Sequence, residues 1–504
     1  MRREMKTIVT DQYRVVEIVD GQQRVTTLVI LLKALEKIFD RSVSAELRLA
    51  QELQGLLVKQ DNASLILLQT NHDKSQYFAN YIRRDEAPSV DDAKTLADRE
   101  LLRAIQECEA FVSRWPDKIQ LLRILKNQLT FIFHELDDEA AVYTVFEVLN
   151  NRGLHVSWLD RLKSMLMALA FEQSNGNQDE HINELHEIWG SIYEAIGLRQ
   201  GMSTEALRFA ATLNSASRLS KTFGEEMAVE SLVSRCEGDA SKAIEVSTWL
   251  LRVTRSVDRF LQDRLRSRAA VTEIAQARLL AVAIILKGLA AEKETELMDT
   301  WEKTSFRVFG LCRKDKRTGV GDYVRLAWDM LNHDSNGDAV LQRMKKISEG
   351  TDHSIEWAVQ HLSDANCYDG WEEELRYLLY RYEEYLARIN GLKFSNEQWN
   401  RIWEASAVES IEHIFPQSKG SQERVSQGKK SVFVHRLGNL MLLPPDLNST
   451  LLALDPRDKV EAYLRTGLLD AAEIANTIQR EGWSERQVAA REKRLLEWVE
   501  STWA

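Results

Sequence analysis

Apolar residues recur at helical spacing through most of the chain. Residues 277–289 and 371–390 are two such runs in the middle of the sequence, and residues 456–464 and 485–502 are two more near its C-terminus. Apolar positions three or four residues apart form one face of an amphipathic helix. Only six prolines and 22 glycines interrupt the pattern, so the sequence predicts a mainly α-helical protein.

Short apolar runs near the N-terminus have the length of β-strands. Residues 15–19, 64–68 and 129–133 are such runs, and helical patterns lie between them. Polar breaks at residues 174–177 and 334–338 divide the long region that follows, which has almost no strand signal.

We therefore expect three regions. Residues 1–170 form a small N-terminal α/β domain, residues 171–400 a helical middle, and residues 401–504 a C-terminal domain in which a short hairpin is embedded in helices. At 504 residues and 44% hydrophobic, the chain is long enough for two or three domains with their own cores.

Nothing in the sequence indicates a membrane or an oxidising compartment. No stretch reaches the roughly 18 uncharged apolar residues of a membrane helix, and the N-terminus lacks a signal-peptide core. Cys108, Cys236, Cys312 and Cys367 are far apart and form no C-x-x-C pair. We expect a cytoplasmic protein with reduced thiols and no membrane partner.

The C-terminal region carries polar groups in the order that phosphodiester hydrolysis requires. Glu412 and His413 lie in a short apolar run, Asn439 precedes a second run, and Asn448 opens a helical segment that contains Lys459. A histidine can take a proton from water, and carboxylate and amide oxygens bind hard divalent cations. The alternative interpretation is a buried turn followed by an ordinary apolar strand.

These ordered residues resemble those of the HNH, or ββα-metal, nucleases. The resemblance implies that His413 is the general base and that Asn439 fixes the hairpin loop and the imidazole ring. It also implies that Asn448 is catalytic as a ligand of the cation, together with Glu412, and that Mg²⁺ or Mn²⁺ is the cofactor. No pair of cysteines flanks the hairpin, so we do not expect the structural zinc of some relatives.

The net charge of −11 constrains a partner less than the distribution of charge does. One basic cluster lies between the two runs of the hairpin: Lys419, Arg424, Lys429, Lys430, His435 and Arg436. Another lies in the helical middle: Arg313, Lys314, Lys316, Arg317 and Arg325. A basic loop can be merely solvated, but adjacency to His413 favours contact of the first cluster with DNA phosphates. The candidate DNA-binding residues are Lys429, Lys430, Arg436 and Lys459.

A second motif lies near the N-terminus, where an apolar strand meets a helix. Its residues are Asp20, Gly21, Gln22, Gln23 and Arg24. Gly21 permits a tight turn, the first turn of a helix presents free N–H groups, and Arg24 adds a fork of donors. Together these groups would bind an anion. Similar turns also precede helices that bind nothing, so the local pattern leaves both interpretations open.

The longer string over residues 19–28 is more specific. It resembles the D-G-Q-Q-R motif of the ParB-like nucleotide-hydrolysing domain in the GmrSD family of modification-dependent, or type IV, restriction endonucleases. Residues 146–154, followed by Asp160 and Lys163, resemble the stretch that ends the same domain, and the C-terminal hairpin resembles the nuclease domain of that family. The phosphorothioate-sensing restriction factor SspE has a similar layout.

The resemblance implies a phage-defence endonuclease. It implies that DNA with a modified base or backbone is cut at the hairpin, and that a nucleoside triphosphate, with GTP a candidate, binds at residues 20–24 and gates cutting. Assembly as a homo-oligomer or with another subunit of a defence system is compatible with it.

The start of the sequence departs from the family pattern. Members normally have several dozen residues before the motif, with a P-x-Y-Q-R-x-Y-x-W strand that completes the nucleotide pocket, whereas Met1 is only about one strand before Asp20. We expect either a start codon upstream or a natural truncation. The alternative function is therefore a nucleic-acid-binding regulatory subunit with a latent nuclease and a defective nucleotide site.

Overall fold

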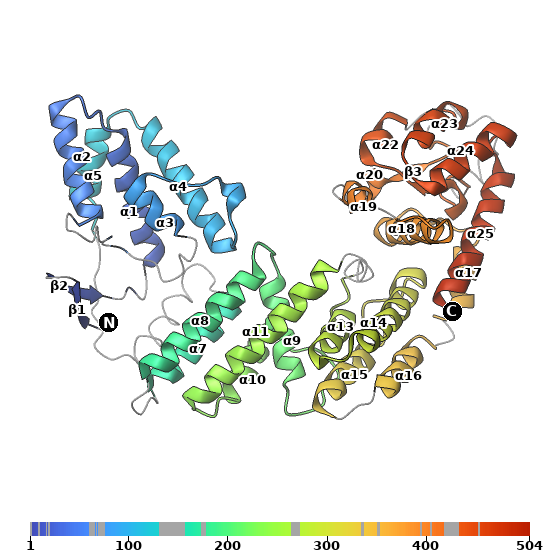
Figure 1. Cartoon of the computed structure of the whole chain (residues 1–504), viewed down its shortest axis with the longest axis horizontal. Helices are drawn as coiled ribbons and strands as arrows, with labels where there is room; N and C mark the ends of the chain where they lie inside the picture. Colours follow the sequence, from blue (N-terminus) through green and yellow to red (C-terminus); the bar gives the residue numbers. More distant parts are fainter. Residues whose placement is uncertain are drawn as a thin grey trace. The chain divides into compact units, whose positions relative to one another are not determined.

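The computed structural model describes most of the chain. The described residues are 3–8, 11–16, 18, 21–59, 66, 68, 76–130, 157–172, 178–263, 273–333, 337–349, 353–393, 396–403, 406–417, 433–451 and 454–504. They divide into two compact units. The first comprises Met1–Asn214 and Phe223–Asp258, and the second comprises Ser215–Thr222 and Arg259–Ala504. Helices dominate both units, as the sequence predicted (Figure 1).

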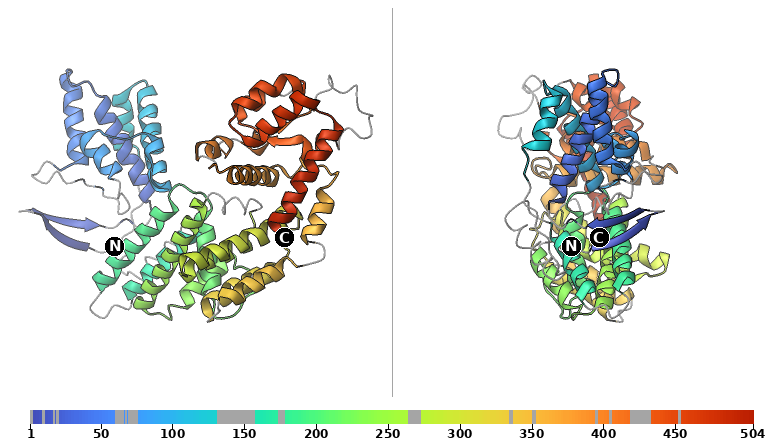
Figure 2. Two further views of the ribbon diagram at one scale, coloured as in Figure 1. Left: turned by 45° about the vertical axis from the view of Figure 1, so that its right-hand side comes forward. Right: turned by 90° about the vertical axis from the view of Figure 1, so that its left-hand side faces the viewer.

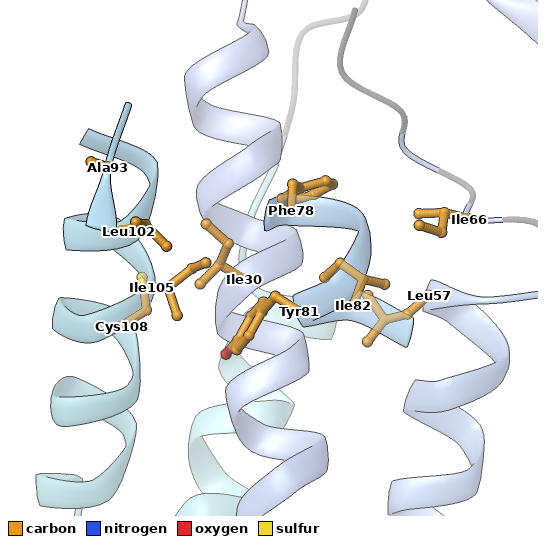
Figure 3. Packing of buried hydrophobic residues seen from close by; sticks show 10 residues of the cluster. All are labelled: Ile30, Leu57, Ile66, Phe78, Tyr81, Ile82, Ala93, Leu102, Ile105 and Cys108. Carbon is orange, nitrogen blue, oxygen red and sulfur yellow. The ribbon is translucent and has the colours of Figure 1, made fainter. Parts of the chain in front are cut away.

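The first unit begins with a group of helices around an apolar core. These are α1 (Gln22–Ile38), α2 (Ser44–Leu57), α3 (Tyr77–Arg84), η1 (Val90–Asp92), α4 (Leu96–Arg114) and α5 (Lys118–Asn127). Ile30 on α1 is fully buried and meets Tyr81 of α3 and Ile105 of α4 in one apolar cluster (Figure 3). A capping box of Thr95 and Asp98 starts α4 by satisfying its first free N–H groups.

The strands of this unit are few in its described part. β1 (Arg3–Ile8) and β2 (Asp11–Val16) pair antiparallel, with Arg3 opposite Val16. Ile66, within the second predicted strand, forms only an isolated bridge with Val58. Residues 131–133 of the third predicted strand lie outside the described residues. The described part of the N-terminal domain is thus more helical than the α/β arrangement that the sequence indicated.

The described part of the first unit also contains α7 (Trp158–Glu172), α8 (Gln178–Ile196), α9 (Met202–Leu213), α10 (Glu225–Ser234) and α11 (Ala240–Gln262). Helix α7 packs against α8, α9 and α10. The N–H of Leu96 donates to Gly197 O at 3.1 Å, which joins the start of α4 to the end of α8. The end of α11 crosses into the second unit.

The second unit has a layer of helices before the hairpin and further helices after it. Its helices before the hairpin are α13 (Ala275–Lys287), α14 (Ala291–Ser305), the π-helix η2 (Phe306–Leu311), α15 (Val320–Asn332), α16 (Gly337–Ile347), α17 (Ile355–Leu362), α18 (Glu372–Ile389), α19 (Asn396–Trp403) and α20 (Ala407–Ser410). After them come β3 (Ile411–His413), η4 (Leu437–Asn439), β4 (Leu440–Leu442), α22 (Pro445–Leu451), α23 (Pro456–Arg465), α24 (Leu469–Glu481) and α25 (Glu485–Trp503).

The helices that the sequence predicted in this unit are confirmed. Observed α13, α18, α23 and α25 match the predicted runs 277–289, 371–390, 456–464 and 485–502 to within two residues at each end. Helix α25 packs against η4, α17 and α14 along its length, so it joins the hairpin to the helical layer of the same unit (Figure 2). Within the described ranges, every helix is too short or too polar to cross a bilayer.

Candidate active site

A minimal hairpin lies at the centre of the C-terminal elements. β3 pairs antiparallel with β4, and Ile411, Glu412 and His413 lie opposite Leu442, Met441 and Leu440. The pairing is extended by two backbone hydrogen bonds, from Ile414 N–H to Asn439 O and from Leu443 N–H to Ser410 O. Every residue of both strands is buried. The short apolar runs of the sequence form a hairpin because neighbouring helices cover both of its faces.

His413 lies at the end of β3 with its side chain largely enclosed. It is 8% exposed. Burial, followed by the nearby His435 and Lys459, lowers the pKa of His413 to about 3. The imidazole is therefore neutral at physiological pH, and one of its nitrogens carries a lone pair. A general base needs that state.

Two other rings surround His413. Its Nε2 lies 3.1 Å from Nδ1 of His435, and the two rings meet at 81°. The ring of Tyr368 meets His413 edge-on at 4.6 Å and stacks on His435 at 5.4 Å and 11°. The amide nitrogen of Gln417 lies 2.9 Å from both ring nitrogens of His413. From the sequence, His435 was predicted only to be one of the basic residues between the two runs of the hairpin. No sequence pattern indicated Tyr368.

Glu412 points away from His413, since successive strand residues face opposite sides. It is 2% exposed, and its Oε1 accepts hydrogen bonds from Lys459 Nζ at 2.7 Å and from Tyr463 OH at 2.9 Å. Burial raises the pKa of Glu412 above its usual range, although both partners oppose that shift. Neither of these two bonds reaches Oε2. A cation bound by Glu412 would have to share the carboxylate with the ammonium of Lys459.

Lys459 is a structural cation of the hairpin. Its side chain is 0% exposed, and Nζ also donates to the carbonyls of His413 and Ile414 at 2.8 and 3.3 Å. The three bonds tie α23 to the end of β3. The side chain of Lys459 does not reach the surface in this structure, so it cannot make the predicted contact with DNA from this position.

Asn439 closes the loop between the strands. Its Oδ1 accepts from the Phe415 N–H at 2.9 Å and from Trp483 Nε1 at 3.1 Å, while its Nδ2 donates to Phe415 O and Val434 O. The side chain thus fixes both ends of the segment that leaves and re-enters the hairpin. All of these partners belong to the loop and to the connection between α24 and α25, so these four bonds of Asn439 do not reach the imidazole of His413.

Asn448 offers an oxygen that no described group satisfies. The residue is 5% exposed, and its Nδ2 donates to Glu409 O at 2.8 Å and Ile411 O at 3.1 Å. These bonds orient the amide, so Oδ1 is fixed as well. Oδ1 is buried, and within the described ranges it accepts no hydrogen bond. A buried carbonyl oxygen without a donor is costly unless a ligand uses it, and amide oxygen is a normal ligand of hard cations. The geometry of Asn448 fits the predicted cation.

Arg491 on α25 holds the second strand in place. Its Nη1 donates to the carbonyls of Leu437, Gly438 and Leu440 at 3.3, 3.0 and 2.9 Å, and its Nη2 pairs with Asp470 at 2.6 Å. The guanidinium is 2% exposed. A fully hydrogen-bonded, paired cation of this kind fixes a unique arrangement of the surrounding backbone.

Gly438 allows this close approach. A Cβ built on Gly438 would lie 2.0 Å from Val488 O and 3.0 Å from Glu492 Cβ. No other residue therefore fits between η4 and α25. This contact explains why a glycine precedes Asn439 in η4.

The predicted DNA-binding residues fall into two groups. Lys429 and Lys430 lie outside the described residues. Arg436 is described, is only 11% exposed, and pairs with Asp364 at 2.6 Å and with Glu492. In this structure Arg436 links the hairpin to α25 and to the segment that precedes α18.

The N-terminal motif is described in part. Gly21 has φ +86 and precedes α1, whose first turn carries no acidic residue. Gln22, Gln23 and Arg24 are exposed on that turn, and Gln22 Nε2 donates to Ile18 O at 2.7 Å. The turn at Gly21 and the helix start after it are those that the sequence predicted. Asp20 and residues 146–154 lie outside the described residues.

Two residues after that second stretch are described. Asp160 accepts a hydrogen bond from the hydroxyl of Tyr193 at 2.5 Å. The ammonium of Lys163 lies 5.3 Å from the centre of the Tyr193 ring, and burial lowers the pKa of Lys163 to about 8. Within the described ranges, no group of three or more His, Cys, Asp or Glu side chains could hold a metal. His181 and His186 on α8 therefore belong to no such group.

Comparison with protein-family models gives two matches. Residues 5–167 match the N-terminal domain of the GmrSD restriction endonucleases, and residues 353–498 match the C-terminal domain of the GmrSD restriction endonucleases. The second match contains the hairpin, Asn448 and Arg491. A comparison with curated proteins finds no match.

Proposed function

Because this chain belongs to the GmrSD restriction endonuclease family, we propose that it is a metal-dependent DNA endonuclease that cuts phosphodiester bonds at the hairpin of β3, β4 and α22. The family match gives the coarser function, a restriction nuclease of the phage-defence type acting on DNA. The HNH chemistry, the cation, the modified substrate and the role of a nucleotide are parts of the proposal.

The observation that carries the proposal is the pairing of a neutral buried histidine with an unsatisfied buried oxygen on one hairpin. His413 can accept a proton at physiological pH, and Asn448 Oδ1 has no donor in the described part of the chain. His413 is itself part of β3, and the Asn448 amide is held by its bonds to the carbonyls of Glu409 and Ile411. A buried packing histidine would not explain the orphan oxygen.

In the proposed mechanism, His413 takes the proton from a water molecule as that water attacks the phosphate. Asn439 keeps the loop after His413 closed, so the imidazole does not drift from the attacking water. Asn448 Oδ1 would hold Mg²⁺ or Mn²⁺. Glu412, the predicted second ligand, faces away from His413 and binds Lys459 and Tyr463, so it would have to turn from them to reach the same cation. When bound, such a cation supplies charge stabilisation for the phosphate in the transition state.

Binding of a nucleoside triphosphate is proposed for the first turn of α1. The free N–H groups of this turn, the exposed Arg24 and the absence of an acidic residue there suit phosphate oxygens. GTP is the candidate ligand that family resemblance suggests. The proposed role of binding is to gate cleavage in the second unit.

The proposal is tested with purified protein, Mg²⁺ or Mn²⁺, and DNA that is unmodified, base-modified or phosphorothioate-modified. At least one DNA class should be cut, and His413→Ala should lower the cleavage rate by on the order of 10² to 10⁴. His361→Ala, an exposed histidine on α17, is the matched control and should cut normally. Equal rates for wild type and His413→Ala would refute the assignment. Binding of DNA without cleavage of any class would favour the regulatory-subunit alternative.

A further inference from the structure

We propose that His435 is a positioning residue of the catalytic centre, which fixes the tautomer and the orientation of His413. The proposal rests on the proposed function of His413 as a general base. It is carried by the direct contact of the two imidazoles, by the way the backbone around His435 is held, and by the packing of Tyr368 on both rings.

The contact between the two rings determines where the proton of His413 lies. A neutral imidazole has one N–H donor and one acceptor nitrogen. His413 Nε2 lies 3.1 Å from His435 Nδ1, so one of these atoms donates and the other accepts. A tautomer is set by the partner that each nitrogen finds.

Gln417 leaves that choice to His435. Its amide nitrogen lies 2.9 Å from each ring nitrogen of His413, so it contacts both and favours neither tautomer. The contact between Nε2 and His435 Nδ1 is the one that distinguishes the two nitrogens of His413. His435 therefore selects which of them carries the proton.

The backbone around His435 is fixed on both sides. The carbonyl of Val434 accepts from Asn439 Nδ2 at 2.8 Å, and Arg436 is paired with Asp364 and Glu492. The carbonyl of His435 itself accepts from the Cys367 N–H at 2.8 Å. A side chain whose neighbours are tied in this way points at His413 before any substrate arrives. Such preorganisation is what a positioning group needs.

Tyr368 limits the rotation of both imidazoles. It follows Cys367, whose N–H holds His435, and its ring stacks on His435 while meeting the edge of His413. Burial raises the pKa of Tyr368, so the ring stays neutral. The three rings form one packed group. Rotation of His413 about its own axis would break the contact with His435 and the edge contact with Tyr368.

The experiment compares two substitutions that separate ring packing from hydrogen bonding. His435→Phe keeps a flat ring on Tyr368 but has no nitrogen, whereas His435→Asn keeps an oxygen that can accept near the position of Nδ1. We expect His435→Phe to lower kcat about 10- to 100-fold, the range for loss of an orienting partner, without a change in KM for DNA. His435→Asn should recover most of kcat. His361→Phe is the matched control and should cut normally.

A second readout is independent of cleavage. In protein labelled with ¹⁵N-histidine, the ring nitrogens of His413 should report a single tautomer in wild type, and a mixture of tautomers in His435→Phe. Normal kcat in His435→Phe, equal losses in the Phe and Asn variants, or a mixture of tautomers of His413 already in wild type would each overturn the proposal. If no DNA is cut, the function proposed above fails, but the tautomer measurement still decides the role of His435.

Discussion

The ammonium of Lys459 lies 2.7 Å from the carboxylate of Glu412, and neither side chain reaches the surface. Removing one member of such a pair leaves an uncompensated charge in the interior. We predict that Lys459→Met lowers the free energy of unfolding by about 3–5 kcal/mol, the usual cost of breaking a buried pair from one side. Urea denaturation of wild type and Lys459→Met measures this difference in the free energy of unfolding.

The double variant Lys459→Met, Glu412→Leu tests the reason for that loss. Since the unpaired carboxylate causes most of the destabilisation, removing it as well should restore part of the stability. Lys493→Met, at 79% exposed on α25, is the control and should change stability by less than about 0.5 kcal/mol. A double variant less stable than the single one would contradict the charge-pair explanation.

The unsatisfied oxygen of Asn448 predicts a change in cation requirement. Asn448→Ala should raise the Mg²⁺ concentration needed for half-maximal cleavage on the order of tenfold or more, because even groups outside the ligand sphere are worth 10- to 100-fold. Cleavage rates across a Mg²⁺ titration measure this effect. Ser449→Ala changes the next, exposed residue of α22 and should leave the titration unchanged. An unaltered Mg²⁺ midpoint in Asn448→Ala would show that Oδ1 is not a ligand.

Gly438 should tolerate no side chain. Since a Cβ there would lie 2.0 Å from Val488 O, Gly438→Ala must push η4 away from α25 and should cost at least roughly 2 kcal/mol of stability. Thermal denaturation and cleavage should both report the loss. Gly55→Ala is the matched control, because nothing lies within 4 Å of a Cβ there and Ala favours the helix α2. Similar melting temperatures for the two variants would rule out this close contact.

Glu383 predicts a pH dependence of stability. Burial raises the pKa of Glu383 from 4.5 to about 7, although it accepts N–H bonds from Leu469 and Asp470. The folded state therefore holds a proton that the unfolded state has released. This contribution to stability is complete below pH 4.5 and is lost as pH rises to about 7, up to roughly 3 kcal/mol.

Glu383→Gln should remove this dependence, because glutamine does not titrate. The variant should lose less stability than wild type between pH 5 and pH 8, as measured by urea denaturation at both values. Glu373→Gln, an exposed carboxylate on the same helix, is the control for the loss of a negative charge on α18. Parallel pH profiles for wild type and Glu383→Gln would mean that Glu383 is ionised throughout.

The start of α1 predicts the site of nucleotide action. If the first turn binds phosphate, Arg24→Ala should abolish nucleotide turnover or nucleotide-dependent cleavage, since it removes the guanidinium fork. Arg48→Ala, exposed on α2, is the control. Calorimetry and cleavage with and without GTP measure the two effects. A wild-type protein that neither binds nucleotide nor responds to it would favour the regulatory alternative.

The sequence predicted those helices and turns that depend on residues close together in the chain. The helix over residues 372–389 follows from apolar spacing, and the left-handed Gly21 before α1 follows from a glycine between a strand and a helix. The order of Glu412, His413, Asn439 and Asn448 also predicted the hairpin. The single helix expected to open at Asn448 and to carry Lys459 was wrong, because Asn448 lies inside α22 (Pro445–Leu451) and Lys459 lies on the separate helix α23 (Pro456–Arg465). Each of these signals lies within a short stretch of sequence.

Contacts between residues that are far apart in the chain could not be predicted from the sequence. His435 follows His413 by 22 positions, and Arg491 follows Gly438 by 53, and no spacing rule joins such pairs. The sequence predicted a DNA contact for Lys459 and did not indicate that its side chain is buried, because a lone lysine on a helix is usually solvated. A buried charge becomes predictable only when its partner can be placed in space.

The dependence of the hairpin on α25 has a consequence for synthesis of the protein. A ribosome makes β3 and β4 before the helix whose Arg491 holds the Leu437, Gly438 and Leu440 carbonyls. The strands therefore leave the ribosome without the support that fixes them. A nascent chain acquires a settled hairpin only after α25 has been translated, by which time the whole first unit has already been made. The hairpin therefore settles only when the rest of the chain is already present.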